Sequence, residues 1–185
     1  MEVLLALSRR MDRLSDRIGR VLAWLAVLLV VVGMINVGAR FLGARFGLPL
    51  AGNGLLEFQT LLFNLLFLLG AVWVLRLDAH LRVDVLQSRC PRRIRAWLDI
   101  VGTVCLLLPF CLFVFLFSLD FVLRSWVHLE LSANPGGLPR YPVKTLIPLT
   151  FLLLALQGLS ELVKRIAWLR GMTEAWPDGS GRGSP

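Results

Sequence analysis

The sequence predicts an all-α integral membrane protein with four transmembrane helices, and three observations support this fold class. Hydrophobic residues make up 57% of the 185 residues, and the mean hydropathy is +0.73. Charged residues make up only 17%, against about 25% in a typical soluble domain. The apolar residues also gather in four runs, each near the roughly 20 residues that cross a bilayer. A soluble core of this size and a disordered chain are both excluded, because the first needs a more polar surface and the second needs low hydrophobicity.

The first 20 residues form an amphipathic pattern. Apolar residues recur there at steps of three and four: Leu4, Leu7, Met11, Leu14 and Ile18. Five arginines occupy other positions of the same segment: Arg9, Arg10, Arg13, Arg17 and Arg20. Such spacing places the apolar side chains on one face of a helix. We therefore expect an N-terminal amphipathic helix in the membrane interface, with a plain cytoplasmic extension of the first span as the alternative.

Four runs are long and apolar enough to be spans. We expect membrane-spanning helices at residues 21–41, 55–75, 100–121 and 146–163. They are expected to be helices because an open strand would leave its backbone groups unpaired in lipid. The first run is too long for a signal-peptide core, which predicts an uncleaved anchor. Pro109 is expected to kink the third span. Residues 1–185 then form a single membrane domain without a soluble one, and 171–185 form a flexible tail.

The distribution of lysine and arginine predicts the orientation. The N-terminal segment, the connection around residues 76–95 and the C-terminal segment together hold 15 of the 20 basic residues. The other two connections hold five. Because basic residues favour the cytoplasmic side, both termini are predicted to be cytoplasmic. The net charge of +8 then indicates anionic membrane lipid as a partner and gives no reason to expect nucleic acid.

Few ionisable residues lie deep within the expected spans, although an ion or proton pathway normally requires them. Glu57 lies early in the second span and Arg40 near the outer end of the first, so the two either pair or are solvated separately at the interface. Asn64 is the strongly polar residue near the middle of a span, and such an asparagine more often bonds a neighbouring helix than a substrate. Asp99 and Glu161 are expected near the inner face.

The sequence gives no support for an enzyme, a cofactor or a metal site. Its three cysteines form no CxxC pair, and haem ligation would need histidines inside the spans, whereas His80 and His128 lie outside them or at their ends. No Ser/His/Asp set, phosphate-binding glycine loop or metal-ligand spacing occurs. The alternating segment 76–85 is the most organised polar stretch. This segment either contacts lipid or the cytoplasmic rim of a partner protein, or it is a solvated loop.

Several segments, taken in order, carry a family resemblance. They are Glu57, LGAVWVLR at 69–76, DAHLRVDVL at 78–86, PGGLPRYPVK at 135–144 and LQGLSELVK at 156–164. In order and spacing they resemble the small membrane subunit of tripartite ATP-independent periplasmic (TRAP) transporters. The candidates for partner-interface or family-signature residues are Glu57, Asn64, Arg76, His80, Arg82, Asp84, Tyr141 and Glu161.

The resemblance implies an importer with three parts in the bacterial inner membrane. A periplasmic substrate-binding protein captures an organic acid anion, and a large membrane subunit carries it inward by a sodium-driven, elevator-like movement. The small subunit packs beside the large one as a static scaffold and is not an enzyme. Two other hypotheses remain: a self-sufficient small multidrug or ion transporter that uses Glu57, and a membrane redox enzyme.

Overall fold

The computed structural model describes residues 2–47, 52–77, 91–132 and 138–171. It is all-helical apart from an isolated bridge between Leu131 and Pro139. Four helical stretches in these ranges are long and apolar enough to cross a membrane. The predicted all-α class with four long apolar helices is therefore confirmed. The expected tail after residue 171 lies outside the described residues.

Helix α1 (Glu2–Phe46) is one unbroken helix of 45 residues. At 1.5 Å per residue it is about 68 Å long, roughly twice the hydrocarbon thickness of a bilayer. It ends before Gly47, whose φ of +68° suits a glycine after a helix end. The amphipathic segment and the first expected span therefore lie on one continuous helix, and the position of this segment in the membrane interface stays a prediction. The apolar stripe is largely exposed, with Leu7 at 56%, because α1 buries a different, polar face.

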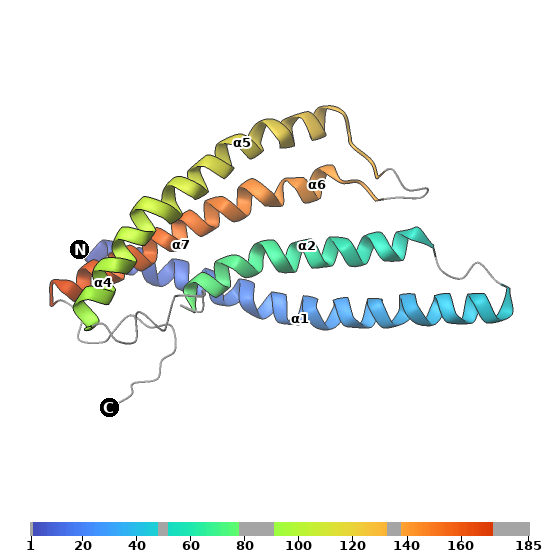
Figure 1. Cartoon of the computed structure of the whole chain (residues 1–185), viewed down its shortest axis with the longest axis horizontal. Coiled ribbons are helices and arrows are strands. Elements are labelled where there is room, and N and C mark those ends of the chain that lie inside the picture. Colours follow the sequence, from blue (N-terminus) through green and yellow to red (C-terminus); the bar gives the residue numbers. More distant parts are fainter. Residues whose placement is uncertain (1, 48–51, 78–90, 133–137, 172–185) are drawn as a thin grey trace.

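Helix α2 (Asn53–Arg76) runs back along α1. The third stretch consists of α4 (Arg92–Gly102), the π-helical turn η1 (Thr103–Leu107) and α5 (Leu108–Val127). Figure 1 shows it as one long bent helix. Pro109 lies two residues after the end of η1. A proline removes one backbone bond and clashes with the carbonyl four residues earlier, and the wider π turn accommodates this irregularity.

The short helix α6 (Tyr141–Lys144) leads into α7 (Leu146–Leu169). Pro148 lies in the first turn of α7, where a proline is tolerated. Helix α7 contacts every other helical element and carries more buried residues than the other helices. Several of these are polar: Thr150, Gln157, Ser160, Glu161 and Arg165. Helix α7 is therefore the central element, and polar side chains join its C-terminal half to its neighbours.

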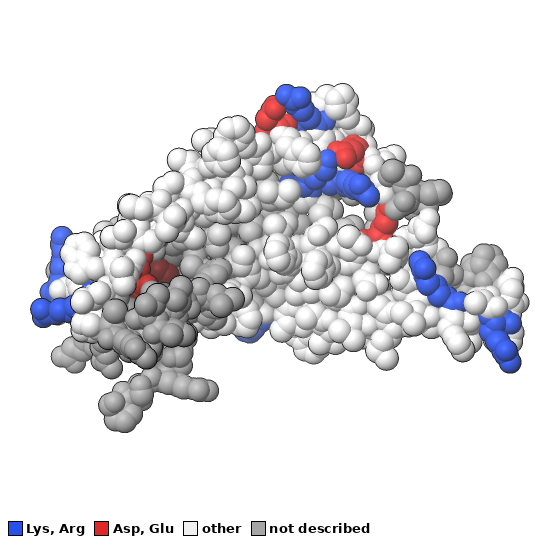
Figure 2. Space-filling model, viewed as in Figure 1, with Lys and Arg blue, Asp and Glu red and all other residues white. Residues whose placement is uncertain are grey.

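The helices form two antiparallel pairs, α1 with α2 and α5 with α7. Figure 1 shows the pairs converging where α1 begins and α7 ends, which we name the N-terminal end, and diverging toward the opposite end, the far end. A small apolar core of Val72, Cys111 and Leu154 lies between the pairs. Figure 2 shows a broad band without charged residues between two charged ends, as expected for a surface that faces lipid.

Candidate functional site

A buried polar cluster joins α1 to α7 at the N-terminal end. We define this N-terminal polar cluster as Ser8, Asp12, Ser15, Gln157, Ser160, Glu161 and Lys164. The Ser8 and Ser160 hydroxyls are 2.6 Å apart, and Ser15 Oγ donates to Gln157 Oε1 at 2.8 Å. Gln157 Nε2 in turn donates to Asp12 Oδ1 at 3.1 Å. Gln157 is fully buried, so its amide is satisfied by protein groups where water is scarce.

Ion pairs extend this cluster to all four long helical stretches. Lys164 Nζ lies 3.2 Å from Asp12 Oδ2 and 2.5 Å from Glu161 Oε1. The guanidinium of Arg165 pairs with Asp99 of α4, and the guanidinium of Arg76 pairs with Asp16. The side chain of Arg165 is 2% exposed. Because removing one member of a buried pair leaves an uncompensated charge, these contacts strongly disfavour separation of the helices.

Glu57 holds the connection between α5 and α6 at the far end. The hydroxyl of Ser132 donates to Glu57 Oε1, and the backbone N–H of Leu138 donates to Glu57 Oε2 at 2.5 Å. The structure thus places Glu57 against this connection, while Arg40 is exposed on α1. The Arg40–Glu57 pair, one of the two alternatives that the sequence left open, does not occur among the described ion pairs, and the Glu57 carboxylate instead contacts the connection.

Glu130 closes the same connection from its other side. It accepts hydrogen bonds from Ser125 Oγ at 2.7 Å and from Lys144 Nζ. The bond from Lys144 is the main cause of a lowered pKa of the Glu130 carboxyl, followed by the bond from Ser125. Lys144 also lies 4.1 Å above the Phe121 ring. The carboxylate is therefore ionised at neutral pH and ties the start of the connection to α6.

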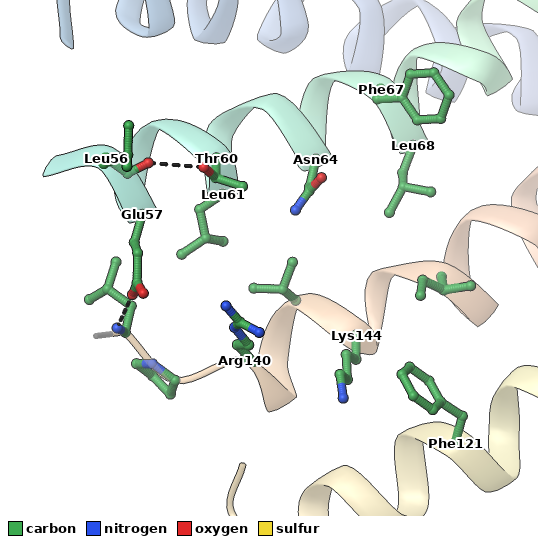
Figure 3. Close-up of a pocket in the computed structure, with 14 residues that line it drawn as sticks. Leu56, Glu57, Thr60, Leu61, Asn64, Phe67, Leu68, Phe121, Arg140 and Lys144 are labelled. Carbon is green, nitrogen blue, oxygen red and sulfur yellow. Dashed lines mark hydrogen bonds between the residues drawn. The ribbon is translucent and has the colours of Figure 1, made fainter. Parts of the chain in front are cut away.

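A groove of about 510 Å³ opens between α2 and residues 138–147. Figure 3 shows Glu57 and Asn64 directed from α2 into this space, with Arg140 facing them. No hydrogen bond of Asn64 occurs within the described ranges, so its predicted role between helices stays a prediction. Asn36 of α1, at 5% exposed, is one of several polar residues that the structure buries within the apolar helices. The sequence analysis missed Asn36, since periodicity alone did not show which face of α1 meets α2.

The candidate residues from the sequence do not form one site. Glu57 and Asn64 line the groove at the far end, and Tyr141 packs edge-on against Trp126 with 4.7 Å between ring centroids. Arg76 and Glu161 lie at the N-terminal end. His80, Arg82 and Asp84 lie outside the described residues. In the part that the structure describes, no group of three or more His, Cys, Asp or Glu residues could hold a metal ion.

The sequence analysis missed several members of the N-terminal contacts. These are Ser8, Asp12, Ser15, Asp16, Gln157 and Ser160. A signal was present, because small or acidic residues recur at positions 8, 12, 15, 16 and 19 of the first helix. This spacing indicates a second face beside the apolar stripe. The polar face was hidden in the sequence by the stronger apolar stripe and the arginines.

Comparison with known families gives one match. The family model described as "Tripartite ATP-independent periplasmic transporters, DctQ component" matches residues 29–167. The matched region includes all of α2, α4 and α5, nearly all of α7 and the second part of α1. No curated protein and no solved structure matches the chain. The family match confirms the resemblance that the sequence motifs carried.

Proposed function

The chain belongs to the DctQ family of small membrane components of TRAP transporters, and on that premise we propose that it is a static scaffold. It is a transporter component with several membrane-spanning helices and not an enzyme. In the proposed system, a large membrane subunit imports an organic acid anion, driven by sodium ions, and a periplasmic protein delivers the anion. The small subunit holds the large one in place during the elevator-like movement.

The observation that carries the scaffold role is the set of contacts at the N-terminal end. An elevator needs a fixed partner, and a fixed partner must resist sliding of its own helices. Ion pairs Arg165–Asp99, Arg76–Asp16 and Lys164–Asp12 cross between different helices. In a medium of low dielectric, such pairs are costly to separate. They support a bundle that moves as one body.

The exposed apolar faces support contact with a larger membrane protein. On α5, aromatic and aliphatic side chains point outward along most of its length: Phe110, Leu112, Phe113, Leu116, Phe117 and Leu123. Lipid could cover this face, but a small helical unit with so little internal core gains additional packing from a neighbour. We propose that the large subunit covers part of the apolar band in Figure 2.

The proposed topology places the N-terminal end in the cytoplasm of a bacterium and the far end in the periplasm. It rests on the 15 to five distribution of basic residues. Charged groups of α1 before residue 21, including Arg9, Arg10 and Arg13, gather at the N-terminal end. In this orientation the connection held by Glu57 and Glu130 faces the side from which a binding protein approaches.

Reconstitution tests the function directly. The chain alone, the large subunit alone and both together are placed in liposomes with an inward sodium gradient, with and without the binding protein. We expect uptake only with both subunits and the binding protein, and co-purification of the two subunits from detergent. Uptake by liposomes that contain this chain alone would overturn the scaffold role.

The second candidate is a self-sufficient transporter in which Glu57 couples ion and substrate movement. Its support is that Glu57 lines a groove together with Arg140 and Asn64. Against it, the Glu57 carboxylate already accepts bonds from Ser132 and Leu138. Glu57→Gln in the full system discriminates between the two, because coupling requires an ionisable side chain at this position. Retained uptake supports the scaffold, whereas complete loss of sodium-coupled uptake with normal assembly supports Glu57 as the coupling group.

A further inference from the structure

A second hollow lies at the N-terminal end, between the start of α1 and the last residue of α2. Its volume is about 530 Å³. The residues that line it are Ala6, Arg9, Arg10, Asp12, Arg13 and Arg76. We name it the arginine pocket. Four of its six lining residues are arginines, whereas the groove at the far end is lined mostly by apolar side chains.

The positive charge of the arginine pocket is largely uncompensated. Its one acidic side chain, Asp12, is already paired with Lys164 and bonded by Gln157. Arg76 pairs with Asp16. No ion pair of Arg9, Arg10 or Arg13 occurs within the described ranges, although Arg13 Nε donates to the Arg9 carbonyl. Several guanidinium groups thus share one hollow with few counter-charges, an arrangement that an anion would stabilise.

Arg76 presents a further unused donor. Its Nε atom is buried and has no hydrogen-bond partner among the residues that the structure describes. Leaving such a donor buried and unpaired is unfavourable. The guanidinium fork suits phosphate and carboxylate oxygens, and the several guanidinium groups around this hollow favour a group with three or more oxygens. A phosphate group suits both the positive charge and the number of donors.

The position of the pocket indicates where such a phosphate would come from. Leu7 and Leu14 lie three residues before and four residues after Arg10, so they neighbour it on the helix surface. Both leucines are exposed, at 56% and 40%. A pocket for a negative group beside an exposed apolar stripe suits an amphiphile with an anionic head.

We propose that the arginine pocket binds a phosphate group, with an anionic phospholipid as its main source. Arg9, Arg10 and Arg13 contact the phosphate from α1, and Arg76 contacts it from α2. Bound phosphate would thereby connect α1 to α2 beside the N-terminal polar cluster. This site is independent of the transport class, since it needs neither the large subunit nor a solute.

Native mass spectrometry of the purified full chain in detergent tests the proposal. The chain is titrated with phosphatidylglycerol, phosphatidylcholine or inorganic phosphate, and bound adducts are counted. We expect a phosphatidylglycerol adduct that the double variant Arg10→Gln/Arg13→Gln weakens on the order of tenfold. The matched control is Arg17→Gln/Arg20→Gln, which removes the same charge from exposed positions of α1 outside the pocket. It is expected to weaken binding several-fold less.

The outcomes separate the possibilities. If both double variants weaken phosphatidylglycerol binding equally, the lipid is attracted by the general surface charge, and the proposed binding at the arginine pocket is overturned. Equal binding of phosphatidylcholine and phosphatidylglycerol would also overturn it. Saturation by inorganic phosphate that prevents lipid binding would keep the phosphate site but identify the source as soluble phosphate.

Arg76→Lys is a second variant, since it keeps the charge beside Asp16 and removes only the guanidinium fork. A reduced adduct with unchanged elution on gel filtration supports the proposal, and an undiminished adduct contradicts it.

Discussion

The two ends of the bundle hold their helices together in different ways. At the N-terminal end, ion pairs and hydrogen bonds of the Gln157 amide cross between α1, α2, α4 and α7. At the far end, the described ion pairs Arg124–Asp120 and Lys144–Glu130 join residues close in sequence, and the helix pairs diverge around a groove. The difference teaches that polar burial, among the described residues, is concentrated where the helix pairs converge. At the far end, the described polar contacts gather at the connection between α5 and α6, so changes there should be felt locally.

The largest expected effect comes from breaking the buried pair between Asp99 and Arg165. Asp99→Asn removes one carboxylate charge from beside the Arg165 guanidinium, whose side chain is 2% exposed. The expected loss of stability is about 3–5 kcal/mol. The measurement is thermal melting in detergent, followed by size-exclusion chromatography of the remaining folded fraction.

The matched control for this pair is Asp120→Asn. Asp120 Oδ2 lies 2.9 Å from Arg124 Nη2, but both side chains are at least 70% exposed. An exposed pair contributes about 0–1 kcal/mol. Equal shifts of the melting temperature for Asp99→Asn and Asp120→Asn would show that the buried pair at the N-terminal end contributes no more to stability than the exposed pair at the far end.

A smaller effect is expected from Gly19, where α1 approaches α2 near the N-terminal end. A Cβ atom at position 19 would lie 2.5 Å from Cδ1 of the Trp73 indole, a bulky ring that must then shift. Gly19→Ala should therefore destabilise the protein by about 1–3 kcal/mol. Thermal melting of the purified chain measures it.

Gly70→Ala is the control for this substitution. Nothing lies within 4 Å of a Cβ built at position 70. There the gain in helix propensity, up to about 1 kcal/mol, is unopposed. Stabilisation by both substitutions would contradict close packing of α1 against α2.

The sequence predicted the four long apolar helices but not the contacts between them. Hydropathy depends on local composition, so the four apolar stretches and the family were recognisable without a structure. The sequence analysis expected a span at 21–41, whereas α1 runs from Glu2 to Phe46. The helix is longer because no helix-breaking residue separates residues 1–20 from the span. The choice of its buried face depends on α7, and packing placed Ser8 and Ser15 inside while Leu7 stayed exposed. Long-range partners such as Gln157 with Asp12, 145 positions apart, leave no local signal.

Asn64 and Asn36 illustrate the same limit within the spans. Position along the chain made Asn64 the expected polar contact between helices. The structure places Asn64 on the wall of the groove and buries Asn36 instead. A helix in lipid shows little difference between its faces, so hydrophobic periodicity cannot reveal which side meets another helix.

At the far end, Glu57→Gln should loosen the connection without unfolding the bundle. The variant keeps the side-chain shape but replaces charge-assisted bonds from Ser132 and Leu138 with weaker ones. We expect the free energy of local opening to fall by about 1–2 kcal/mol. Hydrogen exchange of the Leu138 amide measures it, with Asn64→Ala as a control in the same groove. Unchanged protection of Leu138 in Glu57→Gln would show that the carboxylate does not hold the connection.

The smallest effect, and the most local, is the response of this connection to acid. Because the pKa of Glu130 is lowered from its ordinary value of 4.5, mainly by Lys144, the ionised side chain stabilises the connection fully above that value. This stabilisation is lost as the pH falls through the lowered pKa. The Arg140 amide donates to the Glu130 carbonyl, so its exchange, corrected for the intrinsic rate at each pH, reports closure. We expect protection to be flat from neutral pH to about 5 and to decline in more acidic solution. Glu130→Gln should have lower protection that does not change over this range, whereas an identical decline in the variant would assign the response to another group.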